Sequence, residues 1–139
     1  MRRDILIIGA ALVVCALIAL ILLSVLGPAH AEITAVSTDK DLYHSNELMK
    51  ITITVNSAGN MDNTTARIEG IRDDDAKLRI SHDMPANLST GPNVLFYEYK
   101  LPACSHCSGL EEGTYQVNVT LIRNGAPVSN MTHSVELRQ

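Results

Sequence analysis

The chain has 139 residues, enough for one domain of ordinary size and too few for most multi-lobed enzymes. Hydrophobic residues make up 46% of it, yet aromatic residues are only 4% and tryptophan is absent. The net charge is −4, and after residues 1–4 the remaining 9 basic and 14 acidic residues sum to −5. An acidic chain without a basic run is a poor candidate for binding nucleic acid.

The first predicted element is an apolar segment at 5–27, preceded by a short stub at 1–4. Residues 5–26 contain no charged residue, and a helix of that length reaches roughly 33 Å, enough to cross a bilayer core of about 30 Å. Arg2 and Arg3 precede the segment, and basic residues tend to stay in the cytoplasm. We therefore expect one transmembrane helix or signal anchor, a cytoplasmic N-terminus and an extracellular C-terminal domain.

A signal-peptidase site is a second interpretation of this leader. Ala29-His30-Ala31 is a small-x-small triplet of the kind that signal peptidase cleaves. Cleavage after Ala31 would release a secreted protein that begins at Glu32. The apolar segment is longer than the roughly 7–15 residues usual for a signal-peptide core, which favours a retained anchor.

After a linker at 28–32, the sequence changes to an alternation of apolar and polar residues. Residues 49–55, 115–121 and 131–137 each show this period of two, which is typical of antiparallel strands with one buried face. Weaker alternation adds four strands, at 33–37, 65–71, 77–82 and 94–101. About seven short strands predict an all-β domain at 33–139, folded as an antiparallel two-sheet sandwich.

Turn residues separate these strands. Asn124-Gly125 between two strong strands predicts a tight hairpin, and Gly91-Pro92-Asn93 predicts a turn before the strand at 94–101. In that strand Tyr97 and Tyr99 share the parity of the apolar residues and are expected in the core. Phe96 then points the other way, where it lies under a loop or marks a binding surface.

Residues 37–47, with the sequence STDKDLYHSNE, and the strand that follows resemble the opening of macroglobulin-type and bacterial Ig-like domains. Their pattern is roughly T-D-K-x-x-Y-x-x-G-E. Ser45-Asn46 stands where Pro-Gly is usual, and Asn can adopt the left-handed conformation that glycine would supply. Gly113-Thr114-Tyr115 resembles the G-x-Y start of a late strand in such domains, whose tyrosine hydroxyl latches a corner.

This resemblance covers residues 33–138, implies an Ig-like sandwich and carries no catalytic residue across. The layout of one apolar anchor and one sandwich also resembles small envelope proteins of archaea.

The motif Cys104-Ser105-His106-Cys107 lies in the long connection at 102–113. A location outside the cytoplasm favours a local disulfide between Cys104 and Cys107. Two alternatives stay open for this loop. One is thiol–disulfide exchange, although no βαβ pattern accompanies the motif. The other is a metal site, in which the two cysteines are joined by histidines drawn from His44, His82, His106 and His133.

Four asparagines stand in N-x-S/T sequons: Asn63, Asn87, Asn118 and Asn130. Because two of them lie on the polar parity of their strands, a sugar there would face solvent. We predict glycosylation at these positions. The alternative is that Asn and Thr serve turn and strand propensity alone.

Other polar residues are expected to have structural roles. Asp73-Asp74-Asp75 lacks the spaced alternation of a calcium loop and is expected to be a charged turn. His133 shares parity with core residues and is expected to be a buried, hydrogen-bonded histidine or a strand-edge histidine rather than a ligand. The chain shows no ordered nucleophile, base and acid and no phosphate-binding glycine loop. We therefore assign no catalytic residue, no resident metal and no cofactor, and we do not expect an enzyme.

Together these features predict a membrane-anchored extracytoplasmic module with a non-catalytic binding or structural role in the cell envelope. Its sheet faces or edges would meet another envelope protein or a glycan. Two other functions stay open. The loop with both cysteines would serve thiol–disulfide exchange or metal binding, or the chain would be an accessory subunit of a surface filament or secretion assembly.

Overall fold

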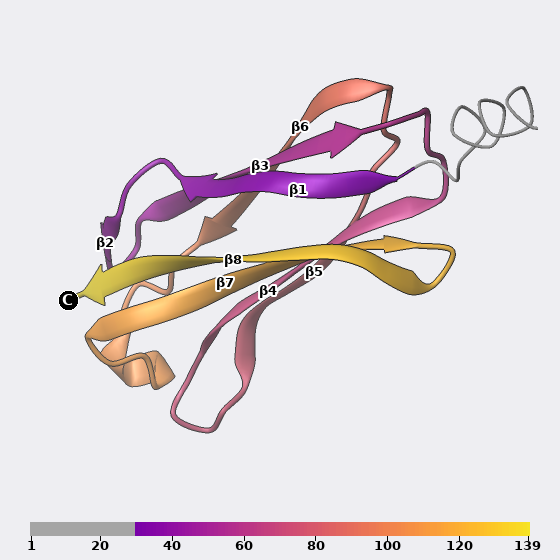
Figure 1. Ribbon diagram of the computed structural model, residues 1–139. Helices are drawn as coiled ribbons and strands as arrows, with labels where there is room; N and C mark the ends of the chain where they lie inside the picture. Colours follow the sequence, from indigo (N-terminus) through magenta and orange to yellow (C-terminus); the bar gives the residue numbers. More distant parts are fainter. Residues whose placement is uncertain (1–29) are drawn as a thin grey trace, which may run out of the picture.

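The computed structural model describes residues 30–139, which fold as two β-sheets packed face to face (Figure 1). The predicted anchor at 5–27 lies outside the described residues. Within residues 30–139, no helix combines the length and the apolar character needed to span a bilayer. The elements are β1 (Ala31–Thr38), β2 (Leu42–His44), β3 (Leu48–Ser57), β4 (Thr64–Arg72), β5 (Leu78–Pro85), β6 (Gly91–Lys100), the 3-10 helix η1 (His106–Ser108), β7 (Gly113–Arg123) and β8 (Ala126–Arg138).

The two sheets differ in size. The small sheet has the strand order β1-β3-β6, and the large sheet has the order β2-β8-β7-β4-β5. The predicted all-β sandwich is therefore confirmed. The expectation of about seven antiparallel strands is corrected, because an eighth strand, β2, pairs in parallel with β8 from Leu42↔Glu136 to His44↔Arg138. A strand of three residues is too short to show an alternation that the sequence could reveal.

The core lies between the inner faces of the two sheets, and it follows the predicted alternation. In β3, the residues Ile51, Ile53 and Val55 are at most 1% exposed, while Lys50 faces solvent. The inner face of the large sheet supplies Ala66, Ile68, Val117, Val119, Leu121, Val135 and Leu137. The removal of these apolar side chains from water is the main contribution to the stability of the packing between the two sheets.

One side of the sandwich is closed where β1 approaches β8. The backbone N–H of Ile33 donates to Ser129 Oγ at 3.0 Å, and Thr38 Oγ1 lies 3.0 Å from His133 Nε2. His133 is half-buried, so the expectation of a hydrogen-bonded histidine is confirmed. These contacts tie the edge of the small sheet to the large sheet.

On the opposite side, β6 is the edge of the small sheet and β5 is the edge of the large sheet. Tyr97 and Tyr99 are half-buried against the core, and His82 of β5 stacks on Tyr97 with ring centroids 4.8 Å apart. Phe96 points outward and is 69% exposed, as predicted. The turn expected at 91–93 is wrong, because β6 already begins at Gly91, where a glycine and a proline are tolerated at a strand start.

The strands define two ends of the sandwich. The N-proximal end is the one where residue 30 enters, and there the carbonyl of His30 accepts the N–H of Ala58 at 2.8 Å. Ala31 already belongs to β1, so the linker predicted at 28–32 ends earlier. The predicted hairpin at Asn124-Gly125 is also at this end and is confirmed, with φ of 50° and 80°. The far end holds η1 and the C-terminus (Figure 1).

Candidate functional site

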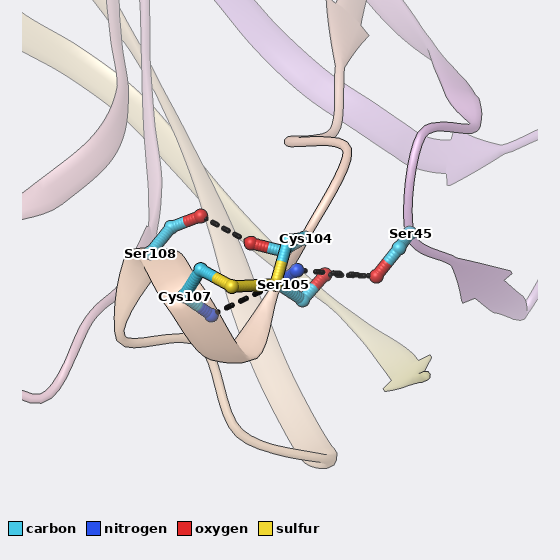
Figure 2. Close-up of a disulfide and its surroundings, with 5 residues drawn as sticks. All are labelled: Ser45, Cys104, Ser105, Cys107 and Ser108. Carbon is cyan, nitrogen blue, oxygen red and sulfur yellow. Dashed lines mark hydrogen bonds between the residues drawn. A yellow bond between two sulfur atoms is a disulfide. The ribbon is translucent and has the colours of Figure 1, made fainter.

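The disulfide predicted between Cys104 and Cys107 is present at the far end, in the connection between β6 and β7 (Figure 2). The two Cα atoms are 5.3 Å apart. The Cys107 N–H donates to Cys104 Sγ at 3.2 Å, and the Ser108 hydroxyl donates to the Cys104 carbonyl at 2.6 Å. Disulfide and hydrogen bonds thus close a compact turn around η1, and both sulfurs are engaged with each other.

This turn is fastened to its neighbours on two sides. Ser105 is 4% exposed, and its Oγ lies 2.7 Å from Ser45 Oγ in the turn between β2 and β3 (Figure 2). On the other side, the Arg79 guanidinium donates to the Ser108 carbonyl and pairs with the buried Asp73 carboxylate at 2.9 Å. Three connections of the far end are therefore held as one unit.

We expect removal of the disulfide by a Cys104→Ser, Cys107→Ser double substitution to lower the free energy of unfolding by about 2 kcal/mol or less, because the bond closes a very short loop. The hydrogen bonds of Ser105 and Ser108 would still hold the turn. Urea unfolding of the full chain in detergent micelles measures the change. Cys15→Ser is the matched control and should leave stability unchanged. Loss of a measurable dithiol-oxidising activity in the double variant would instead favour the exchange function.

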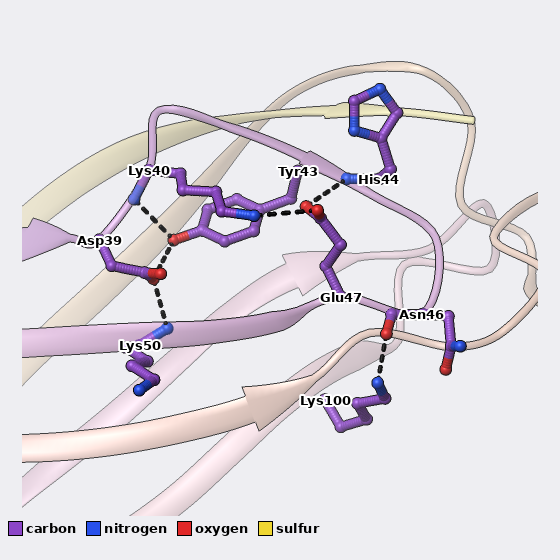
Figure 3. A network of polar contacts seen from close by, with 8 residues as sticks. All are labelled: Asp39, Lys40, Tyr43, His44, Asn46, Glu47, Lys50 and Lys100. Atoms are coloured by element: carbon purple, nitrogen blue, oxygen red, sulfur yellow. Dashed lines mark hydrogen bonds and ion pairs between the residues drawn. The ribbon is translucent and has the colours of Figure 1, made fainter.

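The turn that resembles macroglobulin-type domains is built around Tyr43, which is completely buried (Figure 3). Its hydroxyl donates to Asp39 Oδ1 at 2.6 Å and accepts the Lys40 N–H at 3.0 Å. Asp39 Oδ1 also accepts the Lys50 N–H of β3 at 2.8 Å. The tyrosine of the motif thus links the connection after β1 to β3 through one carboxylate.

These contacts shift two pKa values in opposite directions. Burial, followed by the hydrogen bond to Asp39, raises the pKa of Tyr43 to about 12. The hydrogen bond from Tyr43, followed by the one from the Lys50 N–H, lowers the pKa of Asp39. At neutral pH the pair is therefore a neutral phenol donating to a carboxylate.

The second half of the same turn depends on Glu47 and Asn46. Glu47 accepts the His44 N–H at 3.0 Å and the Lys40 ammonium at 2.9 Å, and these bonds lower the pKa of Glu47 in that order (Figure 3). Asn46 has φ of 67°, and Lys100 Nζ donates to its carbonyl. The prediction that Asn46 takes the left-handed conformation is confirmed.

The corner expected at Tyr115 is also present. Its hydroxyl donates to the Glu111 carbonyl at 2.9 Å, which fastens the start of β7 to the connection before it. Burial raises the pKa of Tyr115. The two motifs that suggested the family resemblance are therefore structural latches at the far end.

A polar groove of about 420 Å³ lies on the large sheet, and no motif in the sequence pointed to it. The pairing of β4 with β7 ends at Gly70↔Val117, and Ile71 has φ of 48°, so β4 turns away from the start of β7. The groove opens where the two strands separate. Its lining is rich in hydroxyl and amide side chains, and it comprises Glu69, Gly70, Arg72, Leu78, Thr114, Tyr115, Gln116, Asn118 and Thr132.

The four sequons lie on exposed or partly exposed positions. Asn63 and Asn87 are exposed in connections near the N-proximal end, and Asn130 is exposed on β8. Asn118 on β7 is half-buried, and its Oδ1 accepts the Thr132 hydroxyl at 3.1 Å. A sugar on Asn118 would lie at the groove, whereas the other three positions are open to solvent. Glycosylation remains a prediction.

Asp73-Asp74-Asp75 forms the charged turn that the sequence predicted. Asp73 Oδ1 accepts the Lys77 N–H at 2.8 Å, and its other oxygen pairs with Arg79. Among residues 30–139, no three side chains of His, Cys, Asp or Glu are grouped as metal ligands would be. The histidines considered for a metal site therefore do not form a group of metal ligands with the two cysteines in this part of the chain.

No family model matches the sequence, and no curated protein matches it. Solved structures resemble the chain at low identity. One is a Paenibacillus sp. cycloisomaltooligosaccharide glucanotransferase complexed with cycloisomaltoheptaose, with a TM-score of 0.63 and 14% identity over 81% of this chain and 15% of that chain. Another is the C-terminal domain of wzt, with a TM-score of 0.57 and 13% identity over 81% and 76% of the two chains.

A CARDB domain of the PF1109 protein from Pyrococcus furiosus, in complex with di-metal ions, is similar at a TM-score of 0.49 and 16% identity, over 80% of this chain and 88% of that chain. The chain spans only 15% of the length of the glucanotransferase. The likenesses to the glucanotransferase and to the wzt domain show the fold alone, a β-sandwich.

Proposed function

We propose that this protein is a membrane-anchored extracytoplasmic module with a non-catalytic binding or structural role in the cell envelope. Residues 5–27 would hold it in the membrane, and the Ig-like domain would face the exterior. Its partner would be another envelope protein or a glycan.

The main support for a retained anchor is the way the chain enters the domain. Ala31 is completely buried and pairs with Ser57, and the carbonyl of His30 accepts the Ala58 N–H at 2.8 Å. Cleavage after Ala31 would remove a buried residue and this hydrogen bond from the start of β1. The fold therefore uses the residues that a secreted form would lose, which favours an intact leader.

The disulfide and the sequons support a location outside the cytoplasm. Disulfides persist in oxidising compartments, and the cytosol keeps thiols reduced. Cys104 and Cys107 are exposed, so a reducing compartment would have access to their bond. Exposed sequons at Asn63, Asn87 and Asn130 are accessible to a glycosylation system on the same side of the membrane.

The groove on the large sheet is the surface best suited to a glycan. Thr114, Gln116 and Thr132 present hydroxyl and amide groups, and Glu69 and Arg72 add a carboxylate and a guanidinium. Sugars offer many hydroxyl groups, each able to donate and accept, which such side chains can satisfy together. A partner protein would instead meet the far-end loops or a sheet edge.

Protease added to intact cells that carry the full chain tests the sidedness of the domain. We expect the protease to degrade the domain on intact cells, because the proposal places the domain outside. We also expect the chain to sediment with membranes only when residues 5–26 are present. Intact-mass analysis of the purified chain then reports whether the leader is present, whether sugars are attached and whether the disulfide is formed. A domain that is protected in intact cells and degraded only after lysis would contradict the proposal.

A further inference from the structure

The outer face of the small sheet exposes two large apolar side chains on its edge strand. Phe96 is 69% exposed and Val94 is 50% exposed, although most large apolar residues of the described chain are buried. Each stands opposite a threonine of β3, in the pairs Thr52↔Phe96 and Thr54↔Val94. The two side chains therefore form one continuous surface with the middle of β3.

This surface carries no charge. We call it the β6 patch, and it comprises Ala35, Ser37, Thr52, Thr54, Pro92, Val94 and Phe96. Glu32 bounds it toward the N-proximal end, and the ion pair of Lys50 with Glu98, at 3.7 Å, bounds it toward the far end. In a domain whose acidic residues outnumber its basic ones, an uncharged sheet face with an exposed phenylalanine marks a contact surface.

The patch is close to the place where the anchor joins the domain. Ala31 pairs with Ser57, and Ser57 pairs with Gly91, so the start of β6 is two strands from the start of β1. Neighbouring strands are about 4.8 Å apart, which separates the two starts by roughly 10 Å. Between the predicted span, which ends at residue 27, and His30 the chain can extend about 10 Å at most. With the predicted anchor in a bilayer, the N-proximal end of the small sheet would thus lie near the membrane surface.

The hydrophilic modifications are expected elsewhere. Asn118 and Asn130 belong to the large sheet, and Asn63 and Asn87 lie in connections between strands. No sequon falls on the β6 patch. Sugars on the four asparagines would leave this face of the small sheet uncovered.

We propose that the β6 patch rests on the lipid headgroup layer of the membrane that holds the anchor, an inference that depends on the proposed function. Phe96 and Val94 enter the boundary between headgroups and acyl chains, and the threonine hydroxyls of β3 bond to headgroup oxygens. The domain then lies with its small sheet toward the bilayer. Its large sheet, with the groove, faces outward.

The absence of tryptophan from the chain makes a clean test possible. Phe96→Trp places a single fluorophore on the patch, and Ser134→Trp places one on an exposed position of β8 in the large sheet as the matched control. Both full-length variants are reconstituted in phosphatidylcholine vesicles with bromine on the upper acyl chain. We expect a blue-shifted emission that loses at least half its intensity to bromine for Phe96→Trp, and little quenching for Ser134→Trp.

Other outcomes separate the alternatives. Flotation with the vesicles, without quenching of Phe96→Trp, overturns the membrane contact and leaves the anchor in place. A blue-shifted, unquenched emission that shifts to the red when the vesicles are diluted with excess lipid identifies a second copy as the occupant and also overturns the proposal. A wild-type chain that fails to float with the vesicles contradicts the anchor itself.

Discussion

Replacement of Tyr43 by phenylalanine should lower the free energy of unfolding at pH 7 by about 1.5–3 kcal/mol, although it removes a single oxygen. That oxygen is buried, donates to the Asp39 carboxylate at 2.6 Å and accepts the Lys40 N–H at 3.0 Å. A hydrogen bond to a charged group is worth more than a neutral one. Its loss also leaves the Lys40 N–H without its acceptor, while Asp39 keeps the bond from the Lys50 N–H. The turn after β1 would loosen first.

The same substitution should change how stability depends on pH. Because the pKa of Tyr43 is raised from 10.0 to about 12 in the folded chain, its stabilising contribution is complete below pH 10 and is lost as the pH rises to 12. A shift of that size corresponds to about 3 kcal/mol. The lowered pKa of Asp39 acts at the other end, with a contribution complete above pH 3.8 that is lost as the pH falls further.

Urea unfolding of both full-length chains in detergent, from pH 3 to pH 12, measures these effects. The advantage of the wild type at pH 7 should shrink between pH 10 and pH 12 and again below pH 3.8. Tyr97→Phe is the matched control, since the Tyr97 hydroxyl makes no hydrogen bond within residues 30–139, and it should change stability at pH 7 by less than about 0.5 kcal/mol. Equal losses in the two variants would contradict the role assigned to the Tyr43 hydroxyl.

The features that the sequence predicted are those determined by neighbours along the chain. Alternation located seven strands because side chains of a strand point to opposite faces in turn. The left-handed Asn46, the Asn124-Gly125 hairpin and the Tyr115 latch each depend on a few adjacent residues. The Cys104–Cys107 disulfide is of the same kind, because its partners are three positions apart in the chain.

The features that escaped prediction depend on residues far apart in the chain. The pairing of β2 with β8 joins residues more than 90 positions apart, and β2 is only three residues long. The groove arises where β4 leaves β7, after a left-handed Ile71 that no propensity favours. The exposure of Phe96 was predictable from parity, but the uncharged surface around it required the register of three strands.

Among the glycines of the described residues, Gly70 is the one where adding a methyl group should lower the free energy of unfolding the most. A Cβ built there would stand 2.6 Å from the Gln116 carbonyl oxygen and 2.9 Å from Val117 Cα. Both atoms belong to the β7 backbone, so no side chain can rotate to make room. This requirement could not be predicted from the sequence, since Gly70 has no left-handed φ and stands inside a predicted strand.

Gly70→Ala should therefore lower the free energy of unfolding by about 3 kcal/mol, as an overpacked core position does. Gly113→Ala is the matched control, because no atom lies within 4 Å of a Cβ at that position, and it should change stability by less than about 0.5 kcal/mol. Urea unfolding of the two full-length variants in detergent compares them, and similar losses would contradict the close approach of β4 to β7. Because Gly70 is also part of the groove wall, the damage should appear there first, as faster amide exchange at Val117 and Gln116 than in the control. The shape of the groove and the packing of the large sheet thus both depend on the absence of a side chain at Gly70.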